Sequence, residues 1–191
     1  MYSSAFGYPH AFIGPATDIA YTDPVTLPLL STEGLDVFSV GSEYTRVEKT
    51  LRVAGLADAS KILDVCVNDK NPSGYTNCST CYKCLRTLAT LDIAGRLSDF
   101  SDSFDLGVYR ARRMLYLAEL LGSSDPLSKE IAEFAKEQNF SFPLLSRLIN
   151  FLGASPAIRF SIRKLRAVKR LLADRSTPSP LPQGSTLGLP M

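Results

Sequence analysis

Three cysteines stand close together in the stretch Asn-Cys-Ser-Thr-Cys-Tyr-Lys-Cys, and they carry the strongest chemical signal in the chain. Cys78, Cys81 and Cys84 follow the spacing C-x2-C-x2-C, and the fourth cysteine, Cys66, lies twelve residues upstream across a turn-rich loop. A C-x2-C step forms a tight turn whose backbone amides point at sulfur, and a third thiolate one helical turn later can converge on the same point. We expect Cys66, at the end of a predicted strand, to complete a tetrahedron.

Four thiolates are a common ligand set of structural Zn²⁺, and their closed shell leaves no position for water or substrate. The single histidine is His10, so a metal site must be built almost wholly from cysteine. The main alternative is a four-iron, four-sulfur cluster, which also binds at this spacing, although no Cys-Pro follows the group. Disulfides are disfavoured in a chain without a secretion signal, and four unligated thiols stay open as the plainest alternative. We predict zinc, with these ligands: Cys66, Cys78, Cys81 and Cys84.

The composition is that of an ordinary globular protein. The chain has 191 residues, of which 45% are hydrophobic and 21% are charged, which suffices for one domain with a core. Charged residues interrupt each apolar run well before the roughly 20 residues that a membrane-spanning helix needs. The opening residues show no basic stretch followed by an apolar block, so no secretory signal is expected. These features predict a cytoplasmic protein without a membrane span.

The elements before the knuckle are predicted to form a small α/β segment. Residues 35–40 and 61–67 are short runs rich in β-branched and aromatic residues, which is typical of buried strands. Between them, Thr45 is followed three residues later by Glu48, which is the capping-box pattern of a helix start. The polar stretch 68–77 has the composition of a loop.

Helical periodicity begins at the last cysteine and continues through most of the remaining chain. Caps, apolar spacing and closing glycines predict five helices, at these places: from Cys84 to Gly95, over 106–121, from Pro126 after the N-cap Asp125, over 144–152 and over 157–172. Residues 174–191 contain four prolines and no period, so they are predicted to be disordered. The predicted fold class is mainly α with a small α/β remnant, in which a four-cysteine zinc knuckle precedes a helical array.

The cysteines and the helix ahead of them together resemble the 7-cyano-7-deazaguanine synthases and related PP-loop ATP pyrophosphatases of the adenine nucleotide α-hydrolase-like superfamily. That family has a distant cysteine and then Cys-x2-Cys-x2-Cys binding zinc near its C-terminus, after a helix that opens with Ser/Thr-Lys-x-Glu. Here Thr-Arg-Val-Glu at 45–48 stands in that place, and Ser79 stands where the family has glycine after the first knuckle cysteine. Some uncharacterised relatives share Thr-Arg-Val-Glu-Lys and Asn-Cys-x2-Cys-x-Lys-Cys-Leu-Arg-Thr, and this chain is more similar to them than to the synthases.

The resemblance implies a domain division and a reaction. Residues 1–104 would be the C-terminal part of a PP-loop-type α/β domain with its zinc knuckle at 66–84, followed by a helical region at 105–173 and a tail at 174–191. In a complete relative, ATP would adenylate a carboxyl-like oxygen with loss of pyrophosphate, and a nitrogen or sulfur nucleophile would displace AMP.

Three residues of the helix before the knuckle are implied by the resemblance to support the substrate: Arg46, Glu48 and Lys49. Local explanations stay open beside that role, because Glu48 also completes a capping box and a lysine on a helix start is commonly solvated. The basic residues are therefore assigned to the substrate side by likeness to the family alone.

One element of the family is missing from this sequence. The related enzymes grip ATP with a Ser-Gly-Gly-x-Asp-Ser loop, whose backbone amides cradle the phosphates, and no Gly-Gly pair occurs in this chain. We therefore expect the chain alone to be inactive and to need a separately encoded or missing N-terminal, ATP-binding half as its partner. The alternative is a non-enzymatic zinc-knuckle helical module that binds a protein or a nucleic acid.

Basic charge gathers in the predicted helix at 157–172. The stretch 156–175 holds seven of the 21 basic residues and one of the 19 acidic residues. An apolar stripe on this helix indicates packing with a solvated basic face, whereas binding to nucleic-acid phosphates or to an anionic membrane surface is the other interpretation. Core packing is the simpler of the two, because few aromatic residues are present to stack on bases.

Overall fold

The computed structural model describes residues 6–14, 19–68 and 74–154, and this part of the chain is mainly helical. Its α-helices are α1 (Asp23–Thr26), α2 (Arg46–Ala54), α3 (Ala59–Ile62), α4 (Tyr82–Ile93), α5 (Leu106–Gly122), α6 (Pro126–Glu137) and α7 (Leu144–Ala154). The described residues also contain four 3-10 turns: Tyr8–His10 and Ile19–Tyr21 before α1, Leu27–Leu30 between α1 and α2, and Leu97–Phe100 between α4 and α5. The prediction of a mainly helical chain is confirmed, and none of the described helices is long and apolar enough to cross a membrane.

Several earlier predictions concern residues outside this description. The basic helix at 157–172 and the tail at 174–191 lie beyond the described residues, as does the middle of the loop at 68–77. The described residues up to Asn150 belong to one compact unit, and the described residues from Phe151 to Ala154 fall outside it.

The two predicted strands are absent, so the α/β remnant is wrong for the described residues. In the first, 35–40, the backbone makes only isolated bridges, and Leu35 and Phe38 are 61% and 58% exposed. In the second, 61–67, the first two residues finish α3 and the rest run extended without a strand partner. A short apolar run becomes a strand only when a neighbouring backbone accepts and donates its hydrogen bonds, and no sheet exists in the described chain to supply one.

A buried side chain takes the place of the missing strand beside residues 63–65. The Asn77 amide donates from Nδ2 to the Leu63 carbonyl at 2.7 Å, and its Oδ1 accepts from the Val65 N–H at 2.9 Å. Asn77 also bonds the Ser103 carbonyl through its backbone N–H and through Nδ2, both at 3.1 Å. One amide thus joins the extended segment before Cys66 to the loop that precedes α5.

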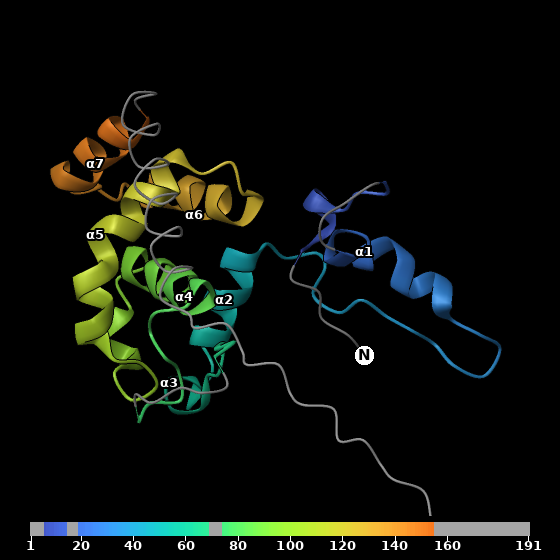
Figure 1. The fold of residues 1–191 in the computed structure, drawn as a ribbon. Helices are drawn as coiled ribbons and strands as arrows, with labels where there is room; N and C mark the ends of the chain where they lie inside the picture. Colours follow the sequence, from blue (N-terminus) through green and yellow to red (C-terminus); the bar gives the residue numbers. More distant parts are fainter. Residues whose placement is uncertain (1–5, 15–18, 69–73, 155–191) are drawn as a thin grey trace, which may run out of the picture. The chain divides into compact units, whose positions relative to one another are not determined.

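Helix α4 lies at the centre of the described fold. Figure 1 shows α4 beside α2, α5 and α6, and residues of α4 contact all three helices. On one side Ala89 and Ile93 pack with residues of α2, α5 and α6, and on another side Leu88 and Leu91 pack with residues around the cysteines. Most of α4 is therefore inaccessible to water, which makes it the element against which the others are placed.

The predicted helix starts are confirmed by their caps. Thr45 Oγ1 accepts from the Glu48 N–H, and Glu48 Oε2 accepts from the Thr45 N–H at 2.7 Å, so the capping box of α2 is complete. Asp105 and Asp125 cap α5 and α6 in the same way, by accepting from backbone N–H groups of the first turn. The local sequence signals were sufficient here because a cap depends on residues within one turn of the helix start.

Glu130 of α6 adds a second cap to α2 from a distance. Its Oε2 accepts from the Arg46 N–H at 2.8 Å and from the Val47 N–H at 3.4 Å, and the side chain is buried. Its Oε1 lies 3.2 Å from His10 Nδ1 in an ionic contact that exists when the imidazole is protonated. Burial raises the pKa of Glu130 above its ordinary value of 4.5, and the bonds from Arg46 and the charge of His10 oppose that rise.

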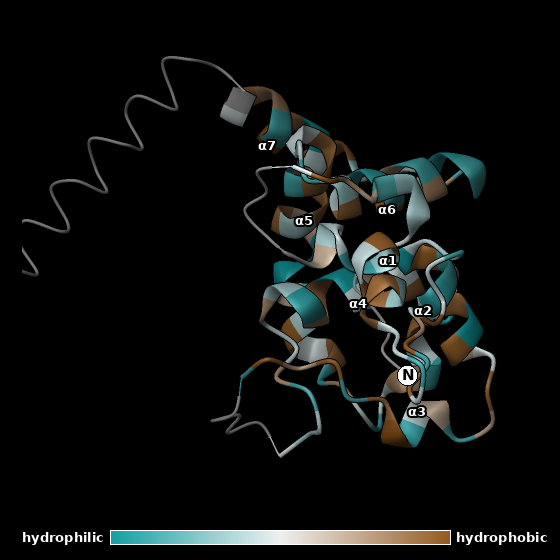
Figure 2. Ribbon diagram, turned by 90° about the vertical axis from the view of Figure 1, so that its right-hand side faces the viewer, coloured by the Kyte–Doolittle hydropathy of each residue, from teal (hydrophilic) through white to brown (hydrophobic). Residues whose placement is uncertain are grey.

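Helix α6 has both polar and apolar residues, and its apolar side chains face the core. Figure 2 shows hydrophilic and hydrophobic residues alternating along α6, whose apolar side chains Ile131 and Phe134 enter the core. The next helix, α7, is held to α5 by the Ser146 hydroxyl, which donates to the Met114 carbonyl at 3.0 Å. Helices α5 and α6 thus pack on α4 and α7 is bonded to α5, so the helices after the cysteines form a helical array, as the sequence predicts.

We expect Asn77→Ala to lower the free energy of unfolding by about 2–4 kcal/mol, because it leaves the Leu63 carbonyl and the Val65 N–H without partners in a buried place. Chemical denaturation of the metal-loaded protein measures this loss. The matched control is Gln138→Ala, which removes an exposed amide at the end of α6 and should cost less than about 0.5 kcal/mol. Equal stability of the two variants would show that Asn77 does not hold the segment.

The raised pKa of Glu130 predicts the sign of a pH effect. A carboxyl whose pKa is higher in the folded protein favours folding while it is protonated, and this contribution is lost as the pH rises from 4.5 through the folded pKa. Glu130→Gln stays neutral at every pH. The difference in free energy of unfolding, wild type minus variant, should therefore become smaller between pH 4 and pH 7, as measured by urea unfolding. A difference that grows over this range contradicts the assignment.

Candidate metal centre

The side chains of the four cysteines lie together in the fold, although Cys66 is twelve residues before the group of three that begins at Cys78. All four Sγ atoms lie within 4.8 Å of one another, with 3.9 Å between Cys78 and Cys84 and 3.4 Å between Cys81 and Cys84. Four sulfurs bound at about 2.3 Å around a tetrahedral ion are separated by about 3.8 Å. The cluster therefore fits the edges of one coordination tetrahedron, and it can hold a metal ion.

Each sulfur is placed by a different local structure. Cys66 ends the extended segment that Asn77 holds, Cys78 and Cys81 flank a tight turn, and Cys84 lies in the first turn of α4. The turn needs a left-handed residue, and Ser79 supplies it with a φ of 57°. That conformation is natural for glycine and uncommon for serine.

Ser79 has a compensating role that glycine lacks. Its side chain is fully buried, and its Oγ accepts from the Asp105 N–H at 2.9 Å at the start of α5. The knuckle turn is in this way bonded directly to the next long helix. Neighbouring Asn77 is bonded to the same loop, so the turn is held on both sides of Cys78.

Backbone amides point at the sulfurs, as the C-x2-C spacing predicts. The Cys81 N–H donates to Cys78 Sγ at 3.3 Å, the Asn68 N–H donates to Cys66 Sγ at 3.3 Å, and the Thr80 hydroxyl donates to Cys78 Sγ at 3.4 Å. Burial opposes ionisation of Cys78, but its hydrogen bonds with Thr80 and with the Cys81 N–H outweigh it and lower the pKa of the Cys78 thiol to about 6. A thiol that ionises near neutral pH is ready to bind a cation.

Cys84 behaves in the opposite way in the absence of a cation. Its burial, followed by its contact with the Cys81 thiol, raises the pKa of Cys84 far above the ordinary range. The sulfur is fully buried among Leu88, Phe100 and Phe104. A dication at the centre would reverse this preference, because a coordinated thiol loses its proton.

The three residues assigned to the substrate side are placed differently from one another. Glu48 is exposed and engaged in the capping box, so its local explanation holds. Arg46 and Lys49 line a cavity of about 220 Å³ that is also bounded by residues 63–65, directly before Cys66, and by Thr87 of α4. The structure thus brings the two cations to a cavity beside the cysteine-bearing segments and leaves Glu48 outside it.

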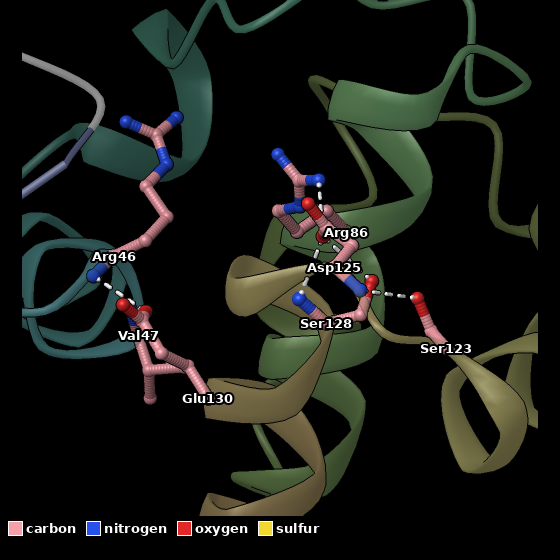
Figure 3. A network of polar contacts seen from close by, with 7 residues as sticks. All are labelled: Arg46, Val47, Arg86, Ser123, Asp125, Ser128 and Glu130. Carbon is pink, nitrogen blue, oxygen red and sulfur yellow. Dashed lines mark hydrogen bonds and ion pairs between the residues drawn. The ribbon is translucent and has the colours of Figure 1, made fainter. Parts of the chain in front are cut away.

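Sequence reasoning missed the polar network that surrounds the start of α2 and α6. Figure 3 shows Glu130 joined to the backbone nitrogens of Arg46 and Val47, and Asp125 joined to Arg86 and to the first turn of α6. Arg86 Nη2 lies 3.3 Å from Asp125 Oδ2, so its charge is directed at α6 rather than at the thiolates. No local pattern points to such pairs, whose members lie 39 and 84 residues apart.

Comparison with known proteins gives no information about the four-cysteine site. No family model matches the chain, and searches of curated proteins and of solved structures found no match.

We predict that serine in place of any one of the four cysteines removes the metal and lowers the melting temperature by about 10 °C or more, because metal binding at such sites is coupled to folding. Elemental analysis and thermal unfolding of purified protein measure both effects. Thr80→Val is the matched control, since it removes only a hydroxyl bonded to Cys78 and keeps four thiols. Full metal content in a three-cysteine variant, or no metal in the wild type, contradicts the site.

Proposed function

We propose that Cys66, Cys78, Cys81 and Cys84 bind one structural Zn²⁺. The single observation that carries this proposal is the convergence of four sulfurs within 4.8 Å, which suits one small ion. A four-iron cluster takes one cysteine at each corner iron, so its sulfurs are spread more widely than four sulfurs that share one ion. Zinc has no redox chemistry, and a four-thiolate shell leaves no open position for substrate.

In this proposal the ion cross-links segments that the Asn77 hydrogen bonds and core packing also hold together. It joins the extended segment that ends at Cys66 to the turn at Cys78 and to α4 through Cys84. Because the four sulfurs come together only in the folded chain, binding of the ion contributes to the free energy of folding, and α4 would begin at a fixed point.

We further propose that the chain is the zinc-bearing portion of an ATP-dependent enzyme of the PP-loop pyrophosphatase type. Support comes from the order of Thr-Arg-Val-Glu at 45–48 and the four cysteines, and from the position of Arg46 and Lys49 at a cavity next to the cysteine-bearing segment. In such an enzyme a second polypeptide would carry the Ser-Gly-Gly-x-Asp-Ser loop and bind ATP.

The roles of this chain's residues follow from where they lie. Arg46 and Lys49 would attract an anionic group of the substrate, and Glu48 would hold the helix start that presents them. The substrate oxygen would attack the α-phosphorus of ATP with release of pyrophosphate, and a nitrogen or sulfur nucleophile would then displace AMP. The zinc clamp takes no part in these bond changes.

We expect ATP turnover only when the missing half is supplied. The test mixes the zinc-loaded chain with a polypeptide that carries the Ser-Gly-Gly-x-Asp-Ser loop, produced from an upstream reading frame or as a separate gene, and measures release of pyrophosphate from ATP. The expected result is release by the mixture and not by either component. A folded, zinc-loaded assembly that stays inactive contradicts the enzyme assignment and favours a zinc module that binds a protein or nucleic acid.

A further inference from the structure

The cavity between α2 and the segment before Cys66 has a composition of its own. One wall carries two cations, Arg46 and Lys49, and the rest of its lining includes the apolar side chains of Val53, Leu63 and Val65. The volume of about 220 Å³ is smaller than that of most pockets for drug-sized ligands. The lining therefore combines a charged side with an apolar side in a space for a small molecule.

The guanidinium of Arg46 is the clearest sign of a ligand. The backbone N–H of Arg46 donates to Glu130, but its guanidinium forms no hydrogen bond or ion pair with the residues that the structure describes. In Figure 3 the guanidinium extends away from the Glu130 carboxylate. Burial and then the nearby charge of Arg86 lower the pKa of Arg46, and the charge of Glu130 only partly opposes them.

Lys49 adds a second positive charge to the same face of α2. The two residues are three apart on one helix, so their side chains are neighbours and repel each other. Burial and then the charge of Arg46 lower the pKa of Lys49, and Glu130 and Glu43 only partly offset these effects. An anion bound beside the Arg46 guanidinium would gain charge-assisted hydrogen bonds, and Lys49 adds positive charge to the same wall of the cavity.

We propose that this cavity binds a small organic anion, with its carboxylate or phosphate at Arg46 and Lys49 and its apolar body against Val53, Leu63 and Val65. The planar fork of arginine matches two oxygens of either group, and lysine adds a point charge. Asp64 also lines the cavity, and its carboxylate would repel an anion and so favour a ligand whose charged end points toward α2.

The chemistry of the lining argues against two simpler ligands. Inorganic phosphate alone would leave the apolar side of the cavity in contact with water, and a neutral apolar molecule would leave Arg46 without a counter-charge. Because it names the substrate class for Arg46 and Lys49, the proposal rests on the proposed function, although its test needs neither ATP nor a partner chain.

The test is a calorimetric titration of the full, zinc-loaded chain with three probes of one shape: benzoate, phenyl phosphate and the neutral benzamide. We expect at least one of the two anions to bind about tenfold or more tightly than benzamide, and Arg46→Gln to weaken that anion about tenfold or more. Preference for benzoate identifies a carboxylate ligand, and preference for phenyl phosphate identifies a phosphate ester.

The matched control is Arg52→Gln on the same helix. Arg52 is exposed, stacks 3.9 Å from the centre of the Tyr44 ring and does not line the cavity, so its loss should leave anion affinity within about twofold. Circular dichroism and zinc content verify that each variant is folded.

Three results would overturn the proposal: no binding of either anion, equal binding of benzamide, or the same loss of affinity in Arg52→Gln as in Arg46→Gln. These outcomes are separate from the fate of the enzyme assignment. Anion binding that persists while pyrophosphate release fails removes only the assignment to an ATP-dependent enzyme. Pyrophosphate release without specific anion binding removes only this pocket.

Discussion

The convergence of four sulfurs at the start of α4 is the constraint on which the described structure depends. Helix α4 contacts α2, α5 and α6, so whatever determines its first turn also determines the frame for the rest. Two of the sulfurs, those of Cys78 and Cys84, belong to a core cluster with Phe100 and Phe104. A metal at this point would be both a cross-link between segments and the edge of a hydrophobic core, which is why its chemistry and the fold are not separable.

Around the four cysteines, buried side chains form hydrogen bonds with backbone groups that neighbouring strands would bond in a β-sheet. The amide of Asn77 satisfies the backbone of residues 63–65, and the hydroxyl of Ser79 bonds the start of α5. The carboxylate of Glu130 bonds the start of α2. Each of these groups is buried, so its loss would leave a backbone group unpaired away from water. The result is a helical fold whose irregular segments are held by single side chains.

Some residues beside the four cysteines contribute both to the fold and to the lining of the cavity. Residues 63–65 lead into Cys66 and also form part of the cavity lining, while Arg46 begins α2 with its backbone on Glu130 and its guanidinium at the cavity. The backbone N–H of Arg46 thus bonds Glu130 within the fold, whereas its guanidinium lines the cavity. The proposed ligand would therefore meet a charge that the helix start does not use, beside a segment that leads into the four-cysteine cluster.

The sequence alone indicated the set of four cysteines, the helix caps at Thr45 and Asp125, and the helical periods, because each is a pattern of residue types at short spacing along the chain. Tertiary structure decided the rest. Residues 35–40 and 61–67 have strand composition, yet they are not strands in the described chain, since a strand requires a partner that local sequence does not specify. Tertiary structure also determined that Glu130 bonds Arg46 and that Asn77 bonds Leu63. Contacts between residues that are distant in sequence depend on packing around α4, so local residue patterns do not predict them.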